Sequence, residues 1–403
     1  MREARDAFDE VVSSTNDTGL GKIKCNEAMK QTSELEDDIL RSYMEDVGKH
    51  NSELFRSFYY GEKIDGFHET VHSTLKLSDS EVLVCGGSYK RGKTCILRKG
   101  EDGSWNYDGE KIDGFHDAVY STLKLSDNEV LVCGNDGGTR ILHKGEDGLW
   151  SYDGNSIDGF DDSVKSTLRL SDNEVLVCGG NGETRILRRD EDGLWNYGSN
   201  SIDGFGEYFI FSTMKLSDSE VLVCGGEYEG ETRILRKDED GLWNYDSNSI
   251  DGFGNAVFLT LRLSDNEVLA CGNDGETRIL RKDEDGSWNY DSNSIDGFGD
   301  NVNSTLRLLD NEVLVCGGNG ETRILRKGED GLWNYDGNSI DGFGEHFIFS
   351  TTKLSDSEVL VCGGEYEGET RILHIDIDID IDLDKLKQKL PDIAAKKDEA
   401  RTI

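Results

Sequence analysis

The chain has 403 residues, with 82 acidic and 44 basic side chains and a net charge of −38. So large a negative charge argues against binding to nucleic acid or to anionic membranes, which requires basic surfaces. No apolar run approaches the roughly 20 residues of a membrane-spanning helix. The first residues, MREARDAFDE, also lack the pattern of a signal peptide. We therefore expect no nucleic acid or membrane partner.

The first 53 residues differ from the rest of the chain and predict a helical extension. Ser33 and Glu36 have the spacing of a capping box, in which each side chain bonds a backbone N–H group of the first helical turn. Leu35 and Ile39 then begin an apolar stripe along a helix over residues 33–47. We expect this stripe to dock on the rest of the protein, with a partner helix as the alternative.

A repeated unit fills the middle of the chain. The tetrapeptide Ile-Asp-Gly-Phe occurs seven times, at spacings of 48, 45, 45, 48, 45 and 45 residues. Each copy holds four short runs rich in β-branched, aromatic or leucine side chains, separated by turn residues. The pattern predicts an all-β fold, a seven-bladed β-propeller with four-stranded blades over residues 54–374. A β-solenoid is the alternative, although its repeats are usually shorter.

The two ends of the repeat array predict how the ring closes. All six tryptophans begin the fourth strand of a copy, and the seventh copy has lost this strand. An unpaired fourth strand lies near residues 54–60, where Tyr59 aligns with Tyr107 of the next copy. We expect this N-terminal strand to complete the last blade, because closure removes exposed sheet edges.

The repeat resembles the kelch repeat. VLVCGG, followed by TRIL and then DGLW, resembles an apolar run that ends in a double glycine and precedes a spaced tryptophan. The second and fifth copies depart from this pattern with Gly-Asn in place of Gly-Gly. The resemblance covers the seven repeats, implies a propeller fold and supports a role in protein binding.

The copies also repeat in larger blocks. Ile64, Ile202 and Ile340 lie 138 residues apart, and the copies follow the order A-B-C-A-B-C-A. Near-identical blades supply rings of one residue type, whereas an enzyme site combines unlike residues from several blades. The sequence shows no distinct Ser/His/Asp set, carboxylate pair or copper ligand set. We predict no catalytic residue, no metal site and no cofactor.

Cysteines and histidines give little sign of metal chemistry. Seven of the nine cysteines follow Val-Leu-Val or Val-Leu-Ala at one repeat position, without CxxC or paired histidines beside them. We expect free, buried thiols, with a zinc site or a thiol nucleophile as the alternative, and therefore a reducing, cytoplasmic compartment. Four histidines fall on copies that adjoin across the closure, and scattered surface residues are favoured over a metal site: His68, His72, His116 and His346.

Aromatic residues in the variable loops predict a partner-binding face. The loop between the second and third strands, and the connection from the fourth strand to the next first strand, share one face of a propeller. Exposed aromatics are frequent hot spots of protein interfaces. The candidate partner-binding residues are Tyr89, Tyr228, Tyr366, Tyr208, Phe209, His346 and Phe347. The alternative is that these rings fill the interfaces between blades.

The innermost strand of every copy carries one basic residue. In so acidic a protein, a ring of seven cations lining the channel would attract an anion or an acidic peptide. The alternative is neutralisation by turn carboxylates such as Asp79 and Glu81. The channel-basic candidates are Lys76, Lys124, Arg169, Lys215, Arg262, Arg307 and Lys353.

The C-terminal residues 375–403 form the last predicted segment. The run IDIDIDIDLD after His374 alternates strictly, which predicts a strand with one isoleucine face and one aspartate face. A polar tail with helical character follows.

Uniform blades, loop aromatics and the kelch resemblance together predict a non-catalytic scaffold that binds a protein or peptide partner on the loop face. We expect a monomer. The alternatives are a propeller enzyme (a carbohydrate-active hydrolase, lyase or oxidase) and a binder of small anions in the central channel.

Overall fold

A computed structural model describes residues 56–377, except residues 110, 155, 161, 200, 228 and 366. The predicted helical extension, the polar tail and most of the Ile-Asp run lie outside the described residues. Residues Tyr60–Leu373 form one compact unit. Within the described part of the chain, no helix is long and apolar enough to cross a membrane.

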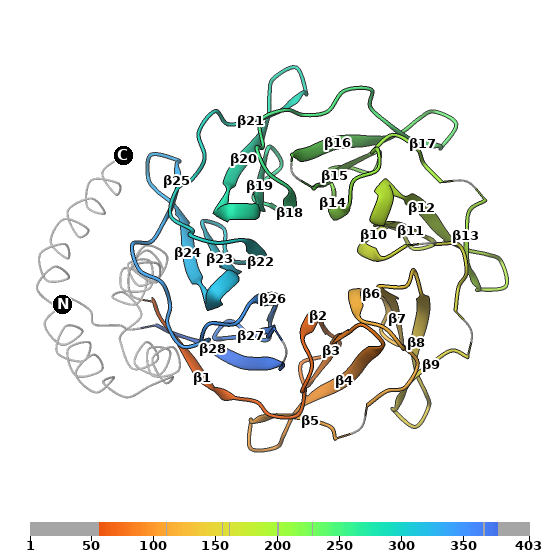
Figure 1. Cartoon of the computed structure of the whole chain (residues 1–403), viewed down its shortest axis with the longest axis vertical. Helices are drawn as coiled ribbons and strands as arrows, with labels where there is room; N and C mark the ends of the chain where they lie inside the picture. The colour runs from red at the N-terminus through yellow and green to blue at the C-terminus, as the bar shows by residue number, and fades with distance from the viewer. Residues whose placement is uncertain are drawn as a thin grey trace, which may run out of the picture. The chain divides into compact units, whose positions relative to one another are not determined.

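The compact unit is an all-β seven-bladed propeller, as the sequence predicts (Figure 1). Blades 1 to 3 consist of β2 (Val71–Lys76), β3 (Glu81–Ser88), β4 (Arg91–Lys99) and β5 (Trp105–Tyr107); β6 (Val119–Ser126), β7 (Glu129–Gly134), β8 (Thr139–Lys144) and β9 (Trp150–Tyr152); and β10 (Val164–Ser171), β11 (Glu174–Gly179), β12 (Thr184–Arg189) and β13 (Trp195–Tyr197). Blades 4 to 6 consist of β14 (Ile210–Lys215), β15 (Glu220–Gly226), β16 (Gly230–Lys237) and β17 (Trp243–Tyr245); β18 (Val257–Arg262), β19 (Glu267–Gly272), β20 (Thr277–Lys282) and β21 (Trp288–Tyr290); and β22 (Val302–Leu309), β23 (Glu312–Gly317), β24 (Thr322–Lys327) and β25 (Trp333–Tyr335).

Blade 7 combines the two ends of the repeat array, which confirms the predicted closure. It contains β26 (Ile348–Lys353), β27 (Glu358–Gly363), β28 (Glu369–Ile377) and β1 (Arg56–Lys63), in the sheet order β1-β28-β27-β26. The first residues of the Ile-Asp run continue β28, the third strand of this blade. Single 3₁₀ turns follow the second strands of blades 3, 5 and 6: η1 (Gly180–Gly182), η2 (Asn273–Gly275) and η3 (Gly318–Gly320).

The hydrophobic core lies between blades. Between blades 2 and 3, for example, Leu131 and Cys133 of one blade pack against Val175, Val177 and Trp195 of the next. All eight described cysteines are free and buried, including the seven at the repeated position. Burial raises the pKa of Cys133, like that of the other repeat cysteines, to about 12, so these thiols stay protonated and act as small apolar groups.

A tyrosine–threonine hydrogen bond links every pair of neighbouring blades. The hydroxyl of a fourth-strand tyrosine lies 2.8–2.9 Å from the hydroxyl of the threonine near the start of the preceding blade's third strand. The pairs are Tyr60–Thr322, Tyr107–Thr370, Tyr152–Thr94, Tyr197–Thr139, Tyr245–Thr184, Tyr290–Thr232 and Tyr335–Thr277. The ring of contacts therefore runs through the closure without a break.

The predicted alignment of Tyr59 with Tyr107 is wrong, because Tyr60 takes that place. Tyr60 bonds Thr322, whereas the Tyr59 ring is 48% exposed and stacks on His374. Tyr60 lies four positions before Ile64, whereas Tyr107 lies five positions before Ile112. Adjacent strand residues point to opposite faces, so only one of the two tyrosines can face the neighbouring blade.

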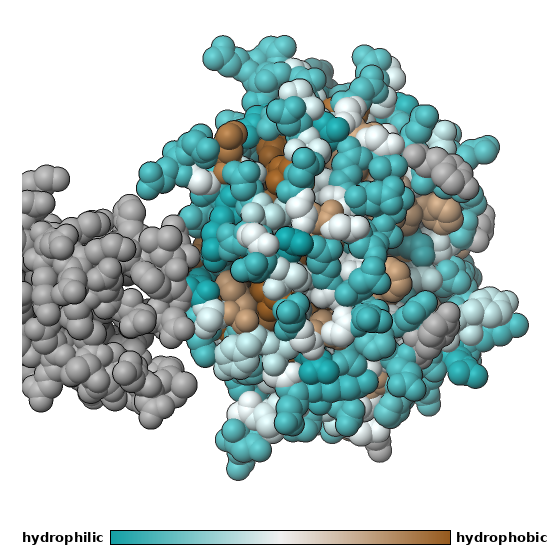
Figure 2. All heavy atoms as spheres, turned by 60° about the vertical axis from the view of Figure 1, so that its left-hand side comes forward, coloured by the Kyte–Doolittle hydropathy of each residue, from teal (hydrophilic) through white to brown (hydrophobic). Residues whose placement is uncertain are grey.

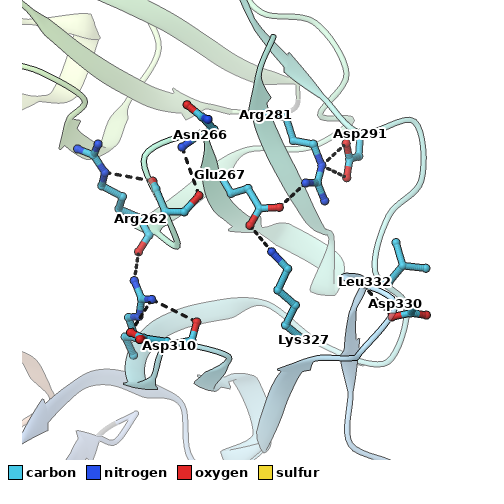
Figure 3. A network of polar contacts seen from close by, with 11 residues as sticks. Arg262, Asn266, Glu267, Arg281, Asp291, Asp310, Lys327, Asp330 and Leu332 are labelled. Atoms are coloured by element: carbon cyan, nitrogen blue, oxygen red, sulfur yellow. Dashed lines mark hydrogen bonds and ion pairs between the residues drawn. The ribbon is translucent and has the colours of Figure 1, made fainter. Parts of the chain in front are cut away.

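Ion pairs add a second contact between blades. In blades 1 to 6, the last residue of the third strand lies over the tryptophan of its own blade and pairs with a glutamate of the preceding blade. Lys327 is 5.9 Å from the Trp333 ring and 2.7 Å from the Glu267 carboxylate, which also pairs with Arg281 (Figure 3). Burial alone would raise the pKa of Glu267, but Lys327 and Arg281 outweigh it and hold the pKa below its usual value.

The hydrogen bond between Tyr60 and Thr322 predicts that substitutions of Tyr59 and Tyr60 differ in their effect on stability. We expect Tyr60→Phe to lower the free energy of unfolding by about 1 kcal/mol, because it removes one of the two hydrogen-bond partners of the buried Thr322 hydroxyl. Tyr59→Phe serves as the matched control and should change stability by less than about 0.5 kcal/mol. Urea unfolding of both variants measures the difference. Equal effects of the two substitutions would contradict the register of β1.

Candidate functional site

A β-bulge near the start of every innermost strand presents a different side chain in most blades. In blade 1, Val71 pairs with Gly86 and Ser73 pairs with Cys85, so His72 between them is the extra, bulged residue. Each of the other six innermost strands has the same register shift at the same place. The bulged residues, here called the bulge ring, are His72, Tyr120, Lys165, Phe211, Phe258, Asn303 and Phe349.

The bulge ring forms contacts from blade to blade around the ring axis. The His72 ring lies 5.3 Å from the Phe349 ring and 4.8 Å from the Tyr120 ring. The Lys165 ammonium lies 3.3 Å from the centroid of Tyr120, a cation–π contact. On the other side, Phe211 meets Phe258 edge to face at 5.1 Å. All seven side chains are half-buried, and their strands β2, β6, β10, β14, β18, β22 and β26 are the innermost of each blade (Figure 1).

Two of the predicted loop aromatics extend the bulge ring. Phe209 stacks on Phe211 and Phe347 stacks on Phe349, each at 5.8 Å between ring centroids. Both loop residues lie at the end of the connection from the preceding blade, directly before the innermost strand begins. They therefore form a second aromatic layer at the entrance of blades 4 and 7.

The remaining predicted partner-binding residues lie farther out in the loops. Tyr89 is 71% exposed, with the Lys90 ammonium 4.9 Å from its ring, and Tyr208 is 47% exposed. His346 is also exposed. Tyr228 and Tyr366 lie outside the described residues, so the expected proximity of Tyr89 and Tyr366 stays a prediction.

Burial changes the protonation of both basic members of the bulge ring. It lowers the pKa of His72 to about 4, against the opposing effect of the hydrogen bond between Nε2 and the Gly87 carbonyl. It lowers the pKa of Lys165 to about 8, although the negative charge of the Asp162 carboxylate acts to raise this pKa. Near pH 7 the imidazole is therefore neutral, while the ammonium keeps most of its charge and is poorly solvated.

The seven channel-basic residues occupy the opposite end of the innermost strands. Each pairs with the aspartate three positions later, at 2.8–3.1 Å. Most also donate a hydrogen bond to the preceding blade, as Lys76 does to the Leu354 carbonyl at 2.7 Å. The predicted anion site in the channel stays a prediction, and an anion would have to compete with seven aspartates there.

The four histidines named from the sequence do not share one environment. His72 belongs to the bulge ring, whereas His68, His116 and His346 are exposed. Among residues 56–377, apart from the six that are not described, no group of three or more His, Cys, Asp or Glu side chains is arranged to hold a metal ion.

Figure 2 shows one side of the propeller surface. That face is mostly hydrophilic, with apolar residues in small, separate groups. Exposed leucines occur singly on the turns between third and fourth strands, one in each of blades 2, 3, 4 and 6: Leu149, Leu194, Leu242 and Leu332.

Comparison with solved structures finds the same fold. The WD40 β-propeller domain of Doa1 matches with a TM-score of 0.61 at 15% sequence identity, over 79% of this chain and 97% of that chain. The C-terminal WD40 domain of Sif2 matches with a TM-score of 0.50 at 11% identity, over 77% and 99% of the two chains. This chain therefore shares the β-propeller fold of these two domains.

No protein-family model matches the sequence, and no curated protein matches it. At 15% and 11% identity the two structural likenesses show a shared β-propeller fold alone. Propellers of this kind carry many functions, so function has to be argued from the residues of the site.

Sequence reasoning missed six of the seven members of the bulge ring. It named His72 only as a scattered histidine, and it did not name Tyr120, Lys165, Phe211, Phe258, Asn303 or Phe349 as one set. A signal was available, because the position before the repeated Ser-Thr differs between copies whereas its neighbours hardly change. What the sequence could not show is that this position is bulged.

The buried His72 predicts a specific pH dependence. Its pKa is about 4 in the folded protein, against 6.5 in an unfolded chain. Between these values the unfolded chain binds more protons, so this contribution to stability is complete above pH 6.5 and is lost as the pH falls toward 4. From pH 7 to pH 5 we expect the wild type to lose about 2 kcal/mol more than the His72→Phe variant.

Phenylalanine is a suitable replacement because blades 4, 5 and 7 carry it at this position. Urea unfolding at pH 7 and pH 5 gives the comparison, with His116→Phe at an exposed position as the control. Parallel pH profiles of the wild type and His72→Phe would contradict the buried, neutral histidine.

Proposed function

We propose that this propeller is a non-catalytic scaffold that binds a protein or peptide partner at the bulge ring and the loops around it. The observation that carries the proposal is the chemical variety of the bulge ring. Its members are three phenylalanines and one each of His, Tyr, Lys and Asn, whereas every preceding residue is Val or Ile. Variation at one position among otherwise uniform blades is expected where side chains meet a partner instead of each other.

The chemistry of the ring suits an extended peptide segment with an apolar or aromatic side chain. Half-buried aromatic rings offer contact area for such an anchor, as in the hot spots of protein interfaces. The Nδ2 group of Asn303 is buried and makes no hydrogen bond to a described residue. A peptide carbonyl would satisfy that donor once the Asn303 side chain turns outward, and the Lys165 ammonium supplies a second polar contact.

The kelch resemblance of the repeats supports the same proposal, as does the WD40-type fold. Both kinds of propeller offer a ring of loops around an axis on which a partner can dock. The enzyme and channel-anion alternatives have no comparable observation in their favour. The monomeric state and the cytoplasmic location stay predictions from the sequence.

Replacing three ring phenylalanines should remove the binding surface. Peptides that bind the full chain can be selected from a displayed random library, and their affinities measured by fluorescence polarisation. We expect the triple variant Phe211→Asn, Phe258→Asn, Phe349→Asn to weaken the selected peptides by at least about tenfold. Asparagine is the residue that blade 6 carries at this position, so the fold should tolerate it.

The control is a triple variant of exposed leucines on the turns between third and fourth strands. Leu149, Leu194 and Leu242 are 59%, 64% and 60% exposed, so their replacement by asparagine should leave the affinities unchanged. The proposal fails if the selected peptides bind the phenylalanine variant as tightly as the wild type, or if no peptide binds.

A further inference from the structure

Five blades carry the same glutamate–arginine pair near the start of their third strand. The sequence Glu-Thr-Arg places a carboxylate oxygen 2.6–2.8 Å from the Nε atom of the arginine two residues later. The pairs are Glu183–Arg185, Glu231–Arg233, Glu276–Arg278, Glu321–Arg323 and Glu369–Arg371. The arrangement recurs from blade 3 to blade 7.

The same carboxylate also binds the loop that enters its blade. In blade 5, Glu276 accepts a hydrogen bond from the backbone N–H of Gly254 at 3.1 Å. In blade 6, Glu321 accepts the equivalent bond from Gly299 at 3.0 Å. A carboxylate at this position is therefore held by a guanidinium on one side and by a backbone N–H group on the other.

Blade 2 keeps the arginine but lacks the carboxylate. Gly138 stands where blades 3 to 7 have glutamate, two residues before Arg140. The Arg140 guanidinium lies 5.9 Å from the Phe115 ring, and within the described residues no carboxylate is within ion-pair distance of it. The blade 2 loop Asn-Asp-Gly-Gly differs from the blade 5 loop Asn-Asp-Gly-Glu at this residue alone.

A pocket of about 380 Å³ opens where the glutamate side chain is missing. Arg140, Gly138 and His116 line it, together with residues 156–160 of the loop that enters blade 3. His116 corresponds to Gly254 of blade 5, since both lie 22 residues before the residue at the glutamate position. The pocket therefore brings together the donors that hold a carboxylate in other blades.

We propose that this pocket binds a carboxylate group of a ligand, in the place of the missing glutamate side chain. The Arg140 guanidinium would donate to the carboxylate oxygens, as such groups do in charge-assisted pairs. The backbone N–H of His116 would supply the second donor. This site extends the proposed scaffold function but does not rest on it, because it needs no contact with the bulge ring.

The neighbouring acidic residues favour a singly charged ligand. Asp136 and Asp158 also line the pocket, and Asp136 accepts a hydrogen bond from the Gly138 N–H at 3.0 Å. Together with the net charge of −38, they disfavour a phosphate dianion. The carboxylate can belong to a small organic acid or to an acidic peptide.

Ligand-observed NMR on the full chain tests the site. We expect propionate to bind, and propionamide, its uncharged analogue, and inorganic phosphate to bind at least about tenfold more weakly. A short peptide with a free C-terminal carboxylate, compared with its amidated form, distinguishes the two sources. Tighter binding of the free-acid peptide than of propionate indicates a peptide ligand, and the reverse order indicates a small acid.

Three variants locate the binding. Arg140→Gln and Gly138→Glu should each weaken propionate by about tenfold or more, the second because it restores the carboxylate of the other blades. A Cβ at Gly138 would meet Asp136 Oδ1 at 2.7 Å, the far end of a movable side chain, so this variant should fold. Glu276→Gly should open an equivalent pocket beside Arg278 and raise the stoichiometry from one site to two.

Matching melting temperatures of the variants establish that the fold is intact. The proposal is overturned if propionate binds Arg140→Gln or Gly138→Glu as tightly as the wild type, if propionamide binds as well as propionate, or if phosphate alone binds. It is also overturned if Glu276→Gly gains no second site. Partner binding at the bulge ring plays no part in these outcomes, so failure here leaves the scaffold proposal standing.

Discussion

A blade of about 45 residues cannot bury either of its faces without a neighbour. Both faces of each sheet carry Val, Leu, Ile, Cys or Trp, and the apolar clusters lie between sheets instead of within them. Every blade must therefore fit two neighbours, and the ring must close. This requirement explains why so many residues recur in all seven copies and why a strand from the N-terminal end completes blade 7.

The same requirement limits where the blades can differ. Residues that face the next blade have to match it, as the tyrosine and threonine hydroxyls do at every junction. A bulged residue is released from the ladder of paired strands, and in this ring it sits on the innermost strand. Its side chain can change without disturbing the interblade clusters. The bulge ring is thus a place where the fold permits chemical variety, and it is where we propose that a partner binds.

Much of the fold is predictable from the sequence because a closed ring of similar blades requires a regular sequence repeat. The spacing of Ile-Asp-Gly-Phe gives the number of blades, and the missing seventh tryptophan indicates which strand crosses the closure. The details that the sequence did not predict correctly depend on strand register, in which a shift of one residue changes the face to which a side chain points. Tyr59 and Tyr60 are adjacent tyrosines, and only the pairing of β1 decides which one faces blade 6. A bulge likewise reverses the alternation of side chains, so a pattern such as Phe-Ile-Phe-Ser-Thr does not reveal which ring points to the axis.

Departures from the repeat differ in meaning according to whether neighbouring residues compensate for them. Blade 1 replaces both members of the glutamate–arginine pair, with Lys93 and Cys95, and Lys93 donates to the Gly66 carbonyl at 2.8 Å.

In blade 5, Leu259 replaces the serine that elsewhere bonds a threonine of the next blade, and it packs against the apolar cluster instead. Blade 2 replaces only one member of the glutamate–arginine pair. Gly138 removes a carboxylate while Arg140 keeps its charge beside a pocket. Half of a charged pair is costly to retain in a partly desolvated place unless water or another anion takes the vacant position. Of these three departures, the one in blade 2 therefore most resembles a binding site.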